Sequence, residues 1–422
     1  MKTGARVAAA IAVLAEVEAR HRPLAEALKE WGRDHRFAGS GDRAQIASLA
    51  YDALRRRASS AWRFGADTPR AWVLGALAFV RGQDAEAIAA LFAESPHAPE
   101  ALDEAERSAL AAASLDGAPP WVLGDYPEWL DEAFARSFGE GRSEEGAALA
   151  MRAPLDLRVN TLKATREDAR AALAAEGWKA EPTPFSPWGL RIQGRRPVTA
   201  GPAFQSGLVE IQDEGSQLVA VLADVRPGMR VADWCAGAGG KTLALAGAMQ
   251  NRGQLLACDV SAARLDGAVR RLRRAGVHNV ERHLVVAGDK WAKRRAGSFD
   301  RVLVDAPCTG TGTWRRNPDA RLRLRESDLL ELLPKQASIL DAAQGLVRKA
   351  GRLVYATCSL LPEENEAQVT AFLARHPGFS LVPAERAAAL APGLRGDDGF
   401  LSLTPAQHGT DGFFAAVMER VA

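Results

Sequence analysis

Apolar residues recur every three or four positions through the first 140 residues of the chain. Val7, Ile11 and Leu14 fall on one face of a helix, and the same spacing returns between Ile46 and Ala53. No alternating run of β-branched residues interrupts this stretch. The pattern therefore predicts an all-helical domain over residues 1–140.

The pattern changes to short extended runs from about residue 150. Leu157–Lys163 and Gly189–Gln193 have the composition of strands, and Thr165 offers an N-cap for a helix between them. We expect residues 150–204 to form a small α/β (ferredoxin-like) subdomain.

Strands alternate with helices from residue 205 onward. Strand-like runs lie near Val231, Leu255, His283, Val302 and Leu353. This alternation predicts a mostly parallel sheet with helices on both faces, which is a Rossmann-like, doubly wound α/β domain over residues 205–422. The final strand candidate, Gly412–Val417, is expected to complete an edge of that sheet.

The amino-acid composition limits the number of domains and the class of protein. The 422 residues predict two or three domains, and 47% hydrophobic residues suffice for real cores. The apolar run Val7–Ala15 is too short to span a bilayer and is followed by Glu16 and Glu18. We expect a cytoplasmic monomer with no membrane partner. The net charge of +2 does not by itself indicate nucleic-acid binding.

The four cysteines contain no C-x-x-C pair. They are Cys235, Cys258, Cys308 and Cys358. So few cysteines in so long a chain argue against a disulfide framework. The seven histidines show no ligand spacing near them, so we expect no metal site and reduced thiols.

A glycine turn follows the strand Arg230–Asp233. Gly237, Gly239 and Gly240 would let the backbone approach a ligand closely, at the end of a strand that faces the ligand crevice of a doubly wound sheet. Asp259 follows Gly240 by 19 residues at the end of the next strand. An acidic residue there commonly accepts hydrogen bonds from ribose hydroxyls.

Three ligands compete for this turn. Thr242 occupies the third glycine position of the dinucleotide pattern, and Cys235 occupies the first glycine position of the P-loop pattern. S-adenosyl-L-methionine has a ribose but no phosphates, so a near miss to both patterns favours it. The alternative is a turn that merely connects a strand to a helix, which the later turns make less attractive.

Two cysteines follow strands at the same predicted edge of the sheet. Cys308 ends the run Asp305-Ala-Pro-Cys, and Cys358 lies in a Thr-Cys-Ser turn. A thiolate that adds to C6 of a pyrimidine makes C5 able to accept a methyl group. Asp305, if it is protonated or shares a proton, could hydrogen-bond N3 of the ring as negative charge develops. A buried cysteine is more often an inert hydrophobe, which is our interpretation of Cys235 and Cys258 as far as nucleophilic chemistry is concerned. Spacing alone leaves open whether Cys308 or Cys358 attacks.

The motifs resemble the RsmB/Nop/Sun family of RNA cytosine-C5 methyltransferases. The resemblance covers roughly residues 150–420 and includes Cys235–Thr242, Gln212–Gln217, the Asp-Ala-Pro-Cys308 turn and Thr357–Asn365. It implies that Cys358 is the nucleophile, that Cys308 assists product release and that S-adenosyl-L-methionine is the cofactor. The implied cofactor contacts are Cys235, Ala236, Gly237, Ala238, Gly239, Gly240, Lys241, Asp259, Arg264, Asp289 and Asp305.

Two further points qualify the resemblance. The family carries Ala-Pro in the glycine turn where this chain has Gly237 and Ala238, and proline would make the loop stiffer. Residues 1–140, with Gly39–Arg43 and Tyr51–Arg57, are similar to the NusB-like, RNA-binding domain of bacterial ribosomal-RNA members.

Basic clusters supply candidate RNA contacts. The clusters are Arg270, Arg271, Arg273 and Arg274; Lys290, Lys293, Arg294 and Arg295; and Arg315, Arg316, Arg321, Arg323 and Arg325. Such runs are usually solvated faces, but the third adjoins Cys308 and could grip phosphates beside the target base. Trp314 could stack on a base or simply pack.

The resulting hypothesis is methylation of cytosine C5 in RNA, with 16S ribosomal RNA as substrate. A transfer-RNA substrate is the nearest alternative. A P-loop nucleotidase and a non-catalytic RNA-binding ribosome assembly factor are the rivals from other classes. The sequence identifies neither the modified nucleotide nor whether naked RNA or an assembly particle is the substrate.

Overall fold

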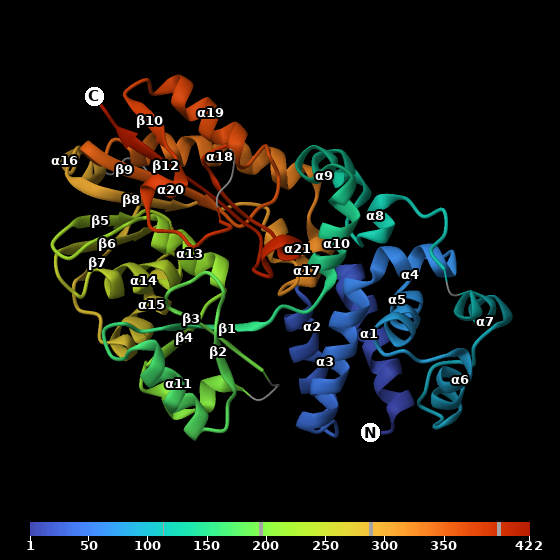
Figure 1. Cartoon of the computed structure of the whole chain (residues 1–422). Coiled ribbons are helices and arrows are strands. Elements are labelled where there is room, and N and C mark those ends of the chain that lie inside the picture. Colours follow the sequence, from blue (N-terminus) through green and yellow to red (C-terminus); the bar gives the residue numbers. More distant parts are fainter. Residues whose placement is uncertain (113, 194–196, 287–289, 395–397) are drawn as a thin grey trace. The chain divides into compact units, whose positions relative to one another are not determined.

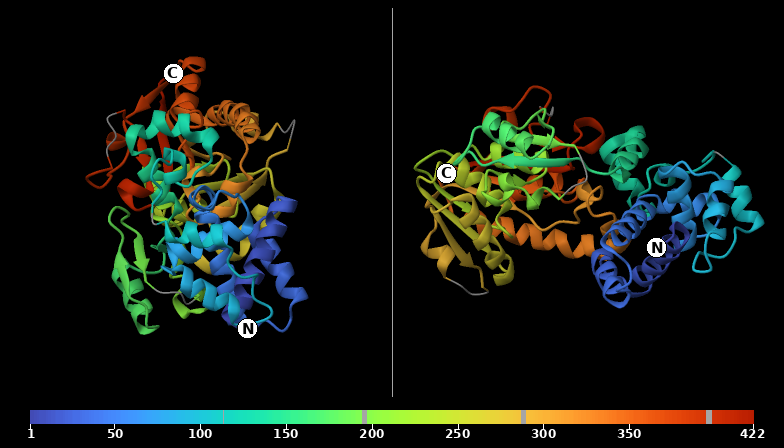
Figure 2. Two further views of the ribbon diagram at one scale, coloured as in Figure 1. Left: turned by 90° about the vertical axis from the view of Figure 1, so that its right-hand side faces the viewer. Right: turned by 90° about the horizontal axis from the view of Figure 1, so that it is seen from below.

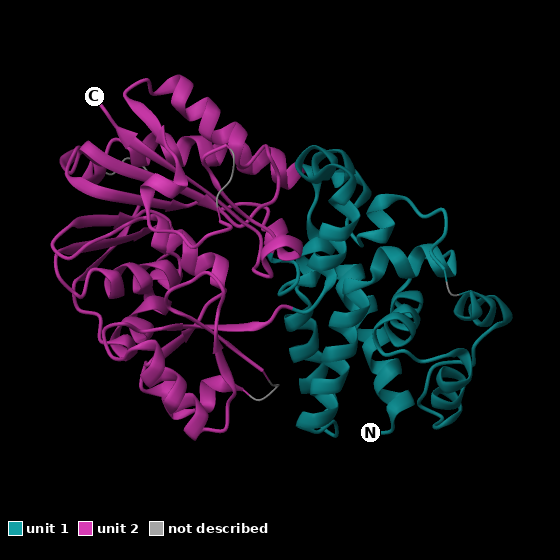
Figure 3. Ribbon diagram, in the orientation of Figure 1, with its two compact units in different colours: residues 1–152, 313–326 teal, residues 153–312, 327–422 magenta. Residues whose placement is uncertain are grey.

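The computed structural model describes residues 1–112, 114–193, 197–286, 290–394 and 398–422. The chain divides into two compact units (Figure 3). The helical unit comprises residues 1–152 and 313–326, and the sheet unit comprises residues 153–312 and 327–422. The chain therefore leaves the sheet unit after Gly312 and returns to it at Ser327.

The described residues of the helical unit form helices and no strands, as the views in Figure 2 also show. Val7, Leu14, Ile46 and Leu49 are fully or almost fully buried, so the 3.6-residue periodicity does mark the faces that pack. The predicted all-helical N-terminal region is confirmed. Its helices are α1 (Thr3–Arg20), α2 (Leu24–Asp34), α3 (Ser40–Arg55), α4 (Arg57–Phe64), α5 (Pro69–Gly75), α6 (Ala85–Ala93), α7 (Glu104–Ala111), α8 (Pro120–Leu123), α9 (Asp131–Phe138), α10 (Arg142–Ala150) and α17 (Pro318–Arg323).

The segment 313–326 packs into the core of the helical unit. Trp314 is completely buried, with its ring centroid 6.3 Å from that of Phe134. The guanidinium of Arg321 lies 4.9 Å from the Trp314 ring centroid and donates a hydrogen bond to the backbone oxygen of Asp125. These contacts explain why a segment so far along the sequence belongs to the N-terminal unit.

The sheet unit begins with a small antiparallel sheet of order β2-β3-β1-β4. Thr165 caps the following helix as predicted, since its hydroxyl accepts a hydrogen bond from the Asp168 backbone nitrogen at 3.1 Å. Leu157 and Leu173 are fully buried between the sheet and this helix. The elements are β1 (Leu155–Val159), α11 (Arg166–Ala175), β2 (Ala180–Pro182), β3 (Gly189–Ile192), α12 (Pro202–Gln205) and β4 (Val209–Ile211).

The larger sheet has the order β10-β12-β9-β8-β5-β6-β7 (Figure 1), and β11 pairs with β12 at Leu401–Leu403. Strands β5 to β9 pair in parallel, whereas β10, β11 and β12 pair antiparallel to their neighbours. The strands are β5 (Arg230–Asp233), β6 (Gln254–Asp259), β7 (Val280–Leu284), β8 (Phe299–Asp305), β9 (Val347–Thr357), β10 (Phe379–Val382), β11 (Leu401–Leu403) and β12 (Phe413–Arg420).

The expectation that Gly412–Val417 completes an edge of the sheet is wrong. Strand β12 lies between β9 and β10 and pairs with both. Every residue from Phe413 to Met418 is buried. A strand covered on both faces has a nearly continuous apolar run, and that run is the feature that separates β12 from an edge strand.

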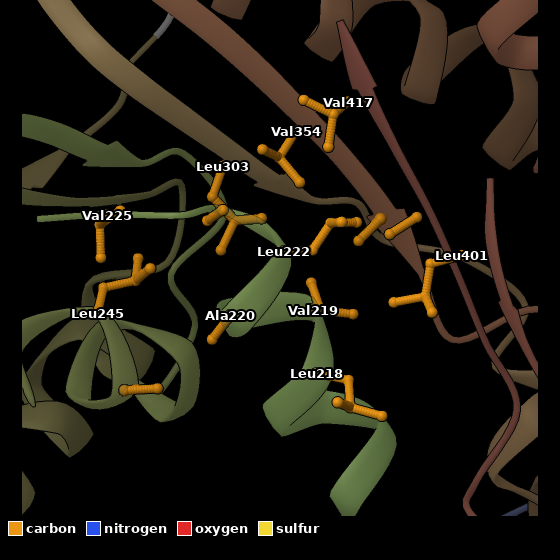
Figure 4. Packing of buried hydrophobic residues seen from close by; sticks show 14 of the residues in the cluster. Leu218, Val219, Ala220, Leu222, Val225, Leu245, Leu303, Val354, Leu401 and Val417 are labelled. Carbon is orange, nitrogen blue, oxygen red and sulfur yellow. The ribbon is translucent and has the colours of Figure 1, made fainter. Parts of the chain in front are cut away.

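Alternate residues of the sheet pack against helices on opposite faces, as a two-residue period requires. Val231, Leu303 and Val354 pack with α13 and α14 on one face, and Figure 4 shows this cluster. Their chain neighbours Ala232 and Val302 pack with α18 and α19 on the other face. The helices are α13 (Glu214–Leu222), α14 (Gly240–Ala248), α15 (Ala262–Ala275), α16 (Trp291–Arg294), α18 (Glu326–Gln344), α19 (Glu366–Arg375), α20 (Ala384–Ala387) and α21 (Pro405–His408). The predicted doubly wound, Rossmann-like fold is confirmed.

Replacement of Leu245 tests this packing. Leu245 in α14 is fully buried against the sheet, so Leu245→Ala should reduce the free energy of unfolding by about 2–5 kcal/mol. Leu330→Ala is the matched control, because Leu330 lies on helix α18 and its surface is 63% exposed. The control should stay within about 0.5 kcal/mol of the parent protein. Thermal unfolding of the two variants makes the comparison, and equal midpoints would contradict the assigned core.

Candidate active site

The glycine turn joins the end of β5 to the start of α14. Gly237 and Gly239 have φ angles of 55° and 80°, which L-residues with a side chain rarely adopt. A Cβ on Gly237 would meet no atom within 4 Å, so the backbone conformation rather than crowding calls for glycine there. The turn leaves backbone exposed along one wall of a cleft, as a ligand-binding turn must.

Asp259 ties this turn to the end of β6. One carboxylate oxygen accepts a hydrogen bond from the Gly237 backbone nitrogen at 2.8 Å, and the other accepts from the Ser261 backbone nitrogen at 2.8 Å. Each carboxylate oxygen has a second lone pair, so Asp259 can still accept bonds from a ligand hydroxyl. The predicted turn and the predicted acidic residue therefore form one structure.

A cavity of about 420 Å³ lies over the carboxyl ends of these strands. Its volume is in the range of about 300–1,000 Å³ that is typical of small-molecule sites. Of the residues that the sequence indicated, those lining it are Cys235, Ala236, Gly237, Ala238, Gly240, Lys241, Asp259, Arg264 and Asp305. Gly239 does not line the cavity, because the position of its missing Cβ faces Ala268. Asp289 lies outside the described residues.

Sequence reasoning missed about half of the lining. The additional residues are Gln212, Ser216, Trp234, Val260, Val285, Pro307, Lys335 and Ile339. Gln212 and Ser216 lie in a run already noted as similar to the family, which was a usable signal. Val260, Val285 and Ile339 carry no motif, and only the fold brings these apolar side chains to the cavity.

The lining fits a nucleoside better than a nucleotide. The Asp259 carboxylate suits ribose hydroxyls, and Val260, Val285 and Ile339 offer an apolar wall for a base. The residues therefore fit S-adenosyl-L-methionine, which combines a nucleoside with a charged amino-acid tail.

Lys241 and Asp305 form an ion pair at the floor of the site. The Lys241 ammonium lies 2.7 Å from the Asp305 carboxylate and is almost fully buried. Burial lowers the pKa of Lys241, but the charge of Asp305 and the hydrogen bond to it outweigh burial and raise the pKa overall. The pair leaves Asp305 as a hydrogen-bond acceptor and Lys241 with donors to spare.

The two thiols of the predicted turns meet. Cys308 follows β8, Cys358 follows β9, and their sulfur atoms lie 3.4 Å apart. Two backbone hydrogen bonds hold the loops together, from Ala306 to Ala356 at 2.8 Å and from Gly312 to Cys358 at 3.0 Å. Strand pairing thus brings into contact two cysteines that are 50 residues apart in the sequence.

The remaining cysteines behave as expected for small apolar residues. Burial, followed by the charge of Asp233, raises the pKa of the Cys235 and Cys258 thiols above the ordinary value. Both stay protonated at neutral pH, which does not suit a nucleophile.

The structure corrects the interpretation of the third arginine cluster. Arg315 and Arg321 are buried inside the helical unit, where Arg321 packs on Trp314. These two arginines cannot grip phosphates, and Trp314 packs rather than stacks on a base. The physical reason is that a guanidinium can satisfy backbone carbonyls and lie over an aromatic ring as readily as it binds phosphate.

The clustered arginines of helix α15 fall into two groups, one paired with other residues and one exposed. Arg271 and Arg274 pair with Glu210, and Arg271 also donates to the Ala238 carbonyl of the glycine turn at 2.7 Å. Arg270 and Arg273 are exposed. Only the exposed pair remains available to an RNA backbone from this cluster.

The described residues contain neither a candidate metal site nor a helix that could span a membrane. Among them, no group of histidine, cysteine, aspartate and glutamate side chains could hold a metal ion. No helix in the same part of the chain combines the length and apolarity needed to cross a membrane.

A doubly wound sheet with a nucleoside-sized cavity over its carboxyl edge is the arrangement of Rossmann-like enzymes that bind nucleoside cofactors, and S-adenosylmethionine-dependent methyltransferases are one such class. The family model described as 16S rRNA methyltransferase RsmB/F matches residues 220–419, and the RsmF/B-like ferredoxin-like domain matches residues 126–199. The chain therefore belongs to the RsmB/F family of S-adenosylmethionine-dependent RNA methyltransferases.

Curated and solved relatives agree with this assignment. A probable ribosomal RNA small subunit methyltransferase B of Synechocystis is 35% identical over 300 residues, which is 70% of this chain and 67% of the relative. Ribosomal RNA small subunit methyltransferase B of Photorhabdus laumondii is 36% identical over 284 residues, which is 65% of each chain. The crystal structure of PH0851 superimposes with a TM-score of 0.76 at 27% identity, covering 100% of this chain and 99% of that one. The alignments thus span about two thirds of the length of the two curated relatives.

Asp233 generates a testable pH dependence. This carboxyl is fully buried at the end of β5, and although the Thr242 hydroxyl donates to it at 2.7 Å, burial raises its pKa to about 7. In the unfolded chain the pKa of this carboxyl is about 4, so the folded state binds the proton more tightly. Stability should therefore fall as the pH rises from about 4 to about 7 and level off above. Asp233→Asn should flatten this slope in melting curves between pH 5 and pH 8, and an unchanged slope would contradict the assignment.

Proposed function

We propose that the protein transfers a methyl group from S-adenosyl-L-methionine to C5 of a cytosine in RNA, through a covalent bond between Cys358 and C6 of the base. The observation that carries the proposal is the pair of sulfurs 3.4 Å apart beside the Lys241–Asp305 ion pair. A pair of free thiols at the edge of a nucleoside cavity suits covalent catalysis on a pyrimidine.

The cofactor site is the cavity over the glycine turn. The turn from Cys235 to Lys241 would hold the cofactor against its backbone, and Asp259 would accept hydrogen bonds from the ribose. Bound there, S-adenosyl-L-methionine supplies an electrophilic methyl group. Arg264 and Lys335, which line the same cavity, are the basic side chains available to a carboxylate tail.

Cys358 is the proposed nucleophile. Its thiolate forms a bond to C6, the electron pair of the C5–C6 double bond moves to C5, and C5 becomes nucleophilic enough to take the methyl group. The C5 proton then passes to solvent, the double bond reforms, and the bond from C6 to sulfur breaks with its electrons returning to Cys358. One methyl cation is gained by the base and one proton is lost, so the charges balance.

Asp305 and Lys241 are proposed to orient the base. Asp305 accepts a hydrogen bond from Lys241, and a carboxylate that accepts in this way also suits the amino group that distinguishes cytosine from uracil. The remaining ammonium hydrogens of Lys241 suit N3 or the carbonyl oxygen, where negative charge develops during attack. This division of labour refines the expectation that Asp305 alone would bind N3.

Cys308 is proposed to assist release of the product. Its thiol can donate a hydrogen bond to Cys358 as that sulfur departs with negative charge. No change in the protonation of Cys308 is needed in that step.

Ribosomal RNA of the small subunit is the proposed substrate, because two relatives carry that activity in their names. We further propose a division of roles by segment: RNA binding by residues 1–140, a ferredoxin-like subdomain over 150–204 and methyl transfer by 205–422. The exposed Arg270 and Arg273 are proposed to contact RNA phosphates in that last segment.

Replacing each thiol separates their roles. Cys358→Ala should give neither a covalent RNA adduct nor 5-methylcytosine, because no sulfur can attack C6. Cys308→Ala should accumulate the adduct, because departure of Cys358 is no longer assisted. Denaturing gels of enzyme with 16S rRNA detect the adduct, and bisulfite sequencing locates the product. Cys258→Ala is the control and should keep activity, since Cys258 lies in the core below the site. Adduct formation by Cys358→Ala would reverse the two roles.

Asp259 should carry much of the cofactor affinity. Asp259→Ala should weaken binding of S-adenosyl-L-methionine by about 10- to 100-fold, the value of about 1.5–3 kcal/mol for hydrogen bonds to a charged group. Asp266→Ala in helix α15 is the control, because Asp266 is exposed, pairs with Arg282 and does not line the cavity. Isothermal titration calorimetry measures both. Tight ATP binding with no S-adenosyl-L-methionine binding would favour a nucleotidase instead.

A further inference from the structure

The positions of the two thiols do not decide which one attacks. Cys308 and Cys358 follow neighbouring parallel strands at the same edge, their sulfurs are in contact, and both residues are partly exposed. Either sulfur could donate the hydrogen bond that joins them. The charged groups around the two thiols must therefore determine which thiol attacks.

Glu364 is a fully buried carboxylate beside Cys308. One of its oxygens accepts hydrogen bonds from the Thr309 backbone nitrogen at 2.9 Å and from the Gln336 amide at 2.8 Å. Its other oxygen accepts from the Thr309 hydroxyl. All of these groups donate and all are uncharged, so both oxygens serve as hydrogen-bond acceptors and none of these partners is a cation.

The same carboxylate holds the Cys308 loop on both sides of the sulfur. Thr309 follows Cys308, and Gln336 also donates to the carbonyl of Pro307, which precedes it, at 3.0 Å. The Tyr355 hydroxyl donates to the Glu364 backbone oxygen at 2.6 Å and fixes the glutamate in turn. Glu364 therefore cannot move away from Cys308 without breaking several buried hydrogen bonds and leaving their donors unsatisfied.

The electrostatic effect on Cys308 is to retain its proton. The hydrogen bond with Cys358 and burial, together with the negative charges of Cys358 and Glu364, raise the pKa of the Cys308 thiol well above its ordinary value. The other titratable group facing Cys308 is Tyr355, whose own pKa is raised first by burial and then by the charge of Cys308. None of the largest effects on the pKa of Cys308 comes from a cation.

Cys358 has the opposite neighbour. Burial lowers the pKa of Lys241, whereas the charge of Asp305 and, after it, the charge of Cys358 raise that pKa. The Lys241 ammonium is therefore a cationic neighbour of Cys358. One thiol thus faces a buried anion and the other a buried cation.

We propose that Glu364 is a positioning residue that assigns the roles of the two thiols: its carboxylate holds Cys308 as the protonated donor, so that Cys358 becomes the thiolate that attacks. The inference rests on the proposed function for the meaning of attack, but the charge asymmetry itself needs neither RNA nor cofactor. Glu364 touches no reacting atom and acts only through Cys308.

Thiol alkylation against pH tests the proposal directly. The full-length protein is treated with iodoacetamide from pH 6 to pH 10, and peptide mass spectrometry gives separate labelling rates for Cys308 and Cys358. In the parent protein Cys358 should label first and Cys308 only at high pH. Glu364→Gln keeps an amide of the same shape but removes the charge, so Cys308 should label at lower pH, with about tenfold more thiolate for each unit by which its pKa falls.

Two variants separate charge from structure. Glu363→Gln makes the same chemical change one residue away and should leave the labelling of both thiols unchanged. Thr309→Ala breaks one hydrogen bond to Glu364 but keeps the carboxylate, so the Cys308 profile should stay close to that of the parent. Melting curves establish that each variant is folded.

The proposal is overturned if Cys308 labels identically in the parent and in Glu364→Gln, including no labelling in either. It is also overturned if Thr309→Ala shifts the Cys308 profile as far as Glu364→Gln does, because loop position would then explain the effect. If the parent protein transferred no methyl group, only the proposed function would be contradicted. The charge asymmetry would still stand, since alkylation requires no substrate.

Discussion

The parallel pairing of β8 with β9 is the constraint on which the candidate active site depends. Its register sets Asp305 opposite Ala356, so the two chains leave the sheet side by side at the same edge. Every later contact follows from this register, including the two loop hydrogen bonds and the contact between Cys308 and Cys358. A slip of one residue would turn Asp305 to the other face of the sheet and separate it from Lys241.

Buried charge is the second organising feature. Neighbouring parallel strands β5, β6 and β8 each end in an aspartate at the same edge of the sheet: Asp233, Asp259 and Asp305. Each is treated differently: Thr242 donates to Asp233, backbone nitrogens bind Asp259, and Lys241 pairs with Asp305. The three aspartates thus have different hydrogen-bond and ion-pair partners, although their side chains are the same. The same principle distinguishes Cys308 from Cys358.

Much of this arrangement could be predicted from local pattern. Alternating strands and helices indicated the doubly wound sheet, and the Gly237–Gly240 turn with Asp259 indicated a nucleoside site, because both signals depend on residues close together in the chain. Strand β12 was misplaced at an edge because its order in the sheet depends on pairing with strands more than 30 residues away. The cluster that includes Arg315 and Arg321 was misinterpreted because a run of arginines looks the same whether it is solvated or buried.

By itself, the sequence determined the fold class, the helical N-terminal region, the glycine turn and the identity of the candidate thiols, since each is encoded by spacing along the chain. Only the tertiary structure decided that the sulfurs touch, that Lys241 faces Asp305, and that Glu364 lies under the Cys308 loop. The reason is physical: these interactions join residues separated by 50 or more positions, and their energies depend on distance and burial, which no linear pattern specifies.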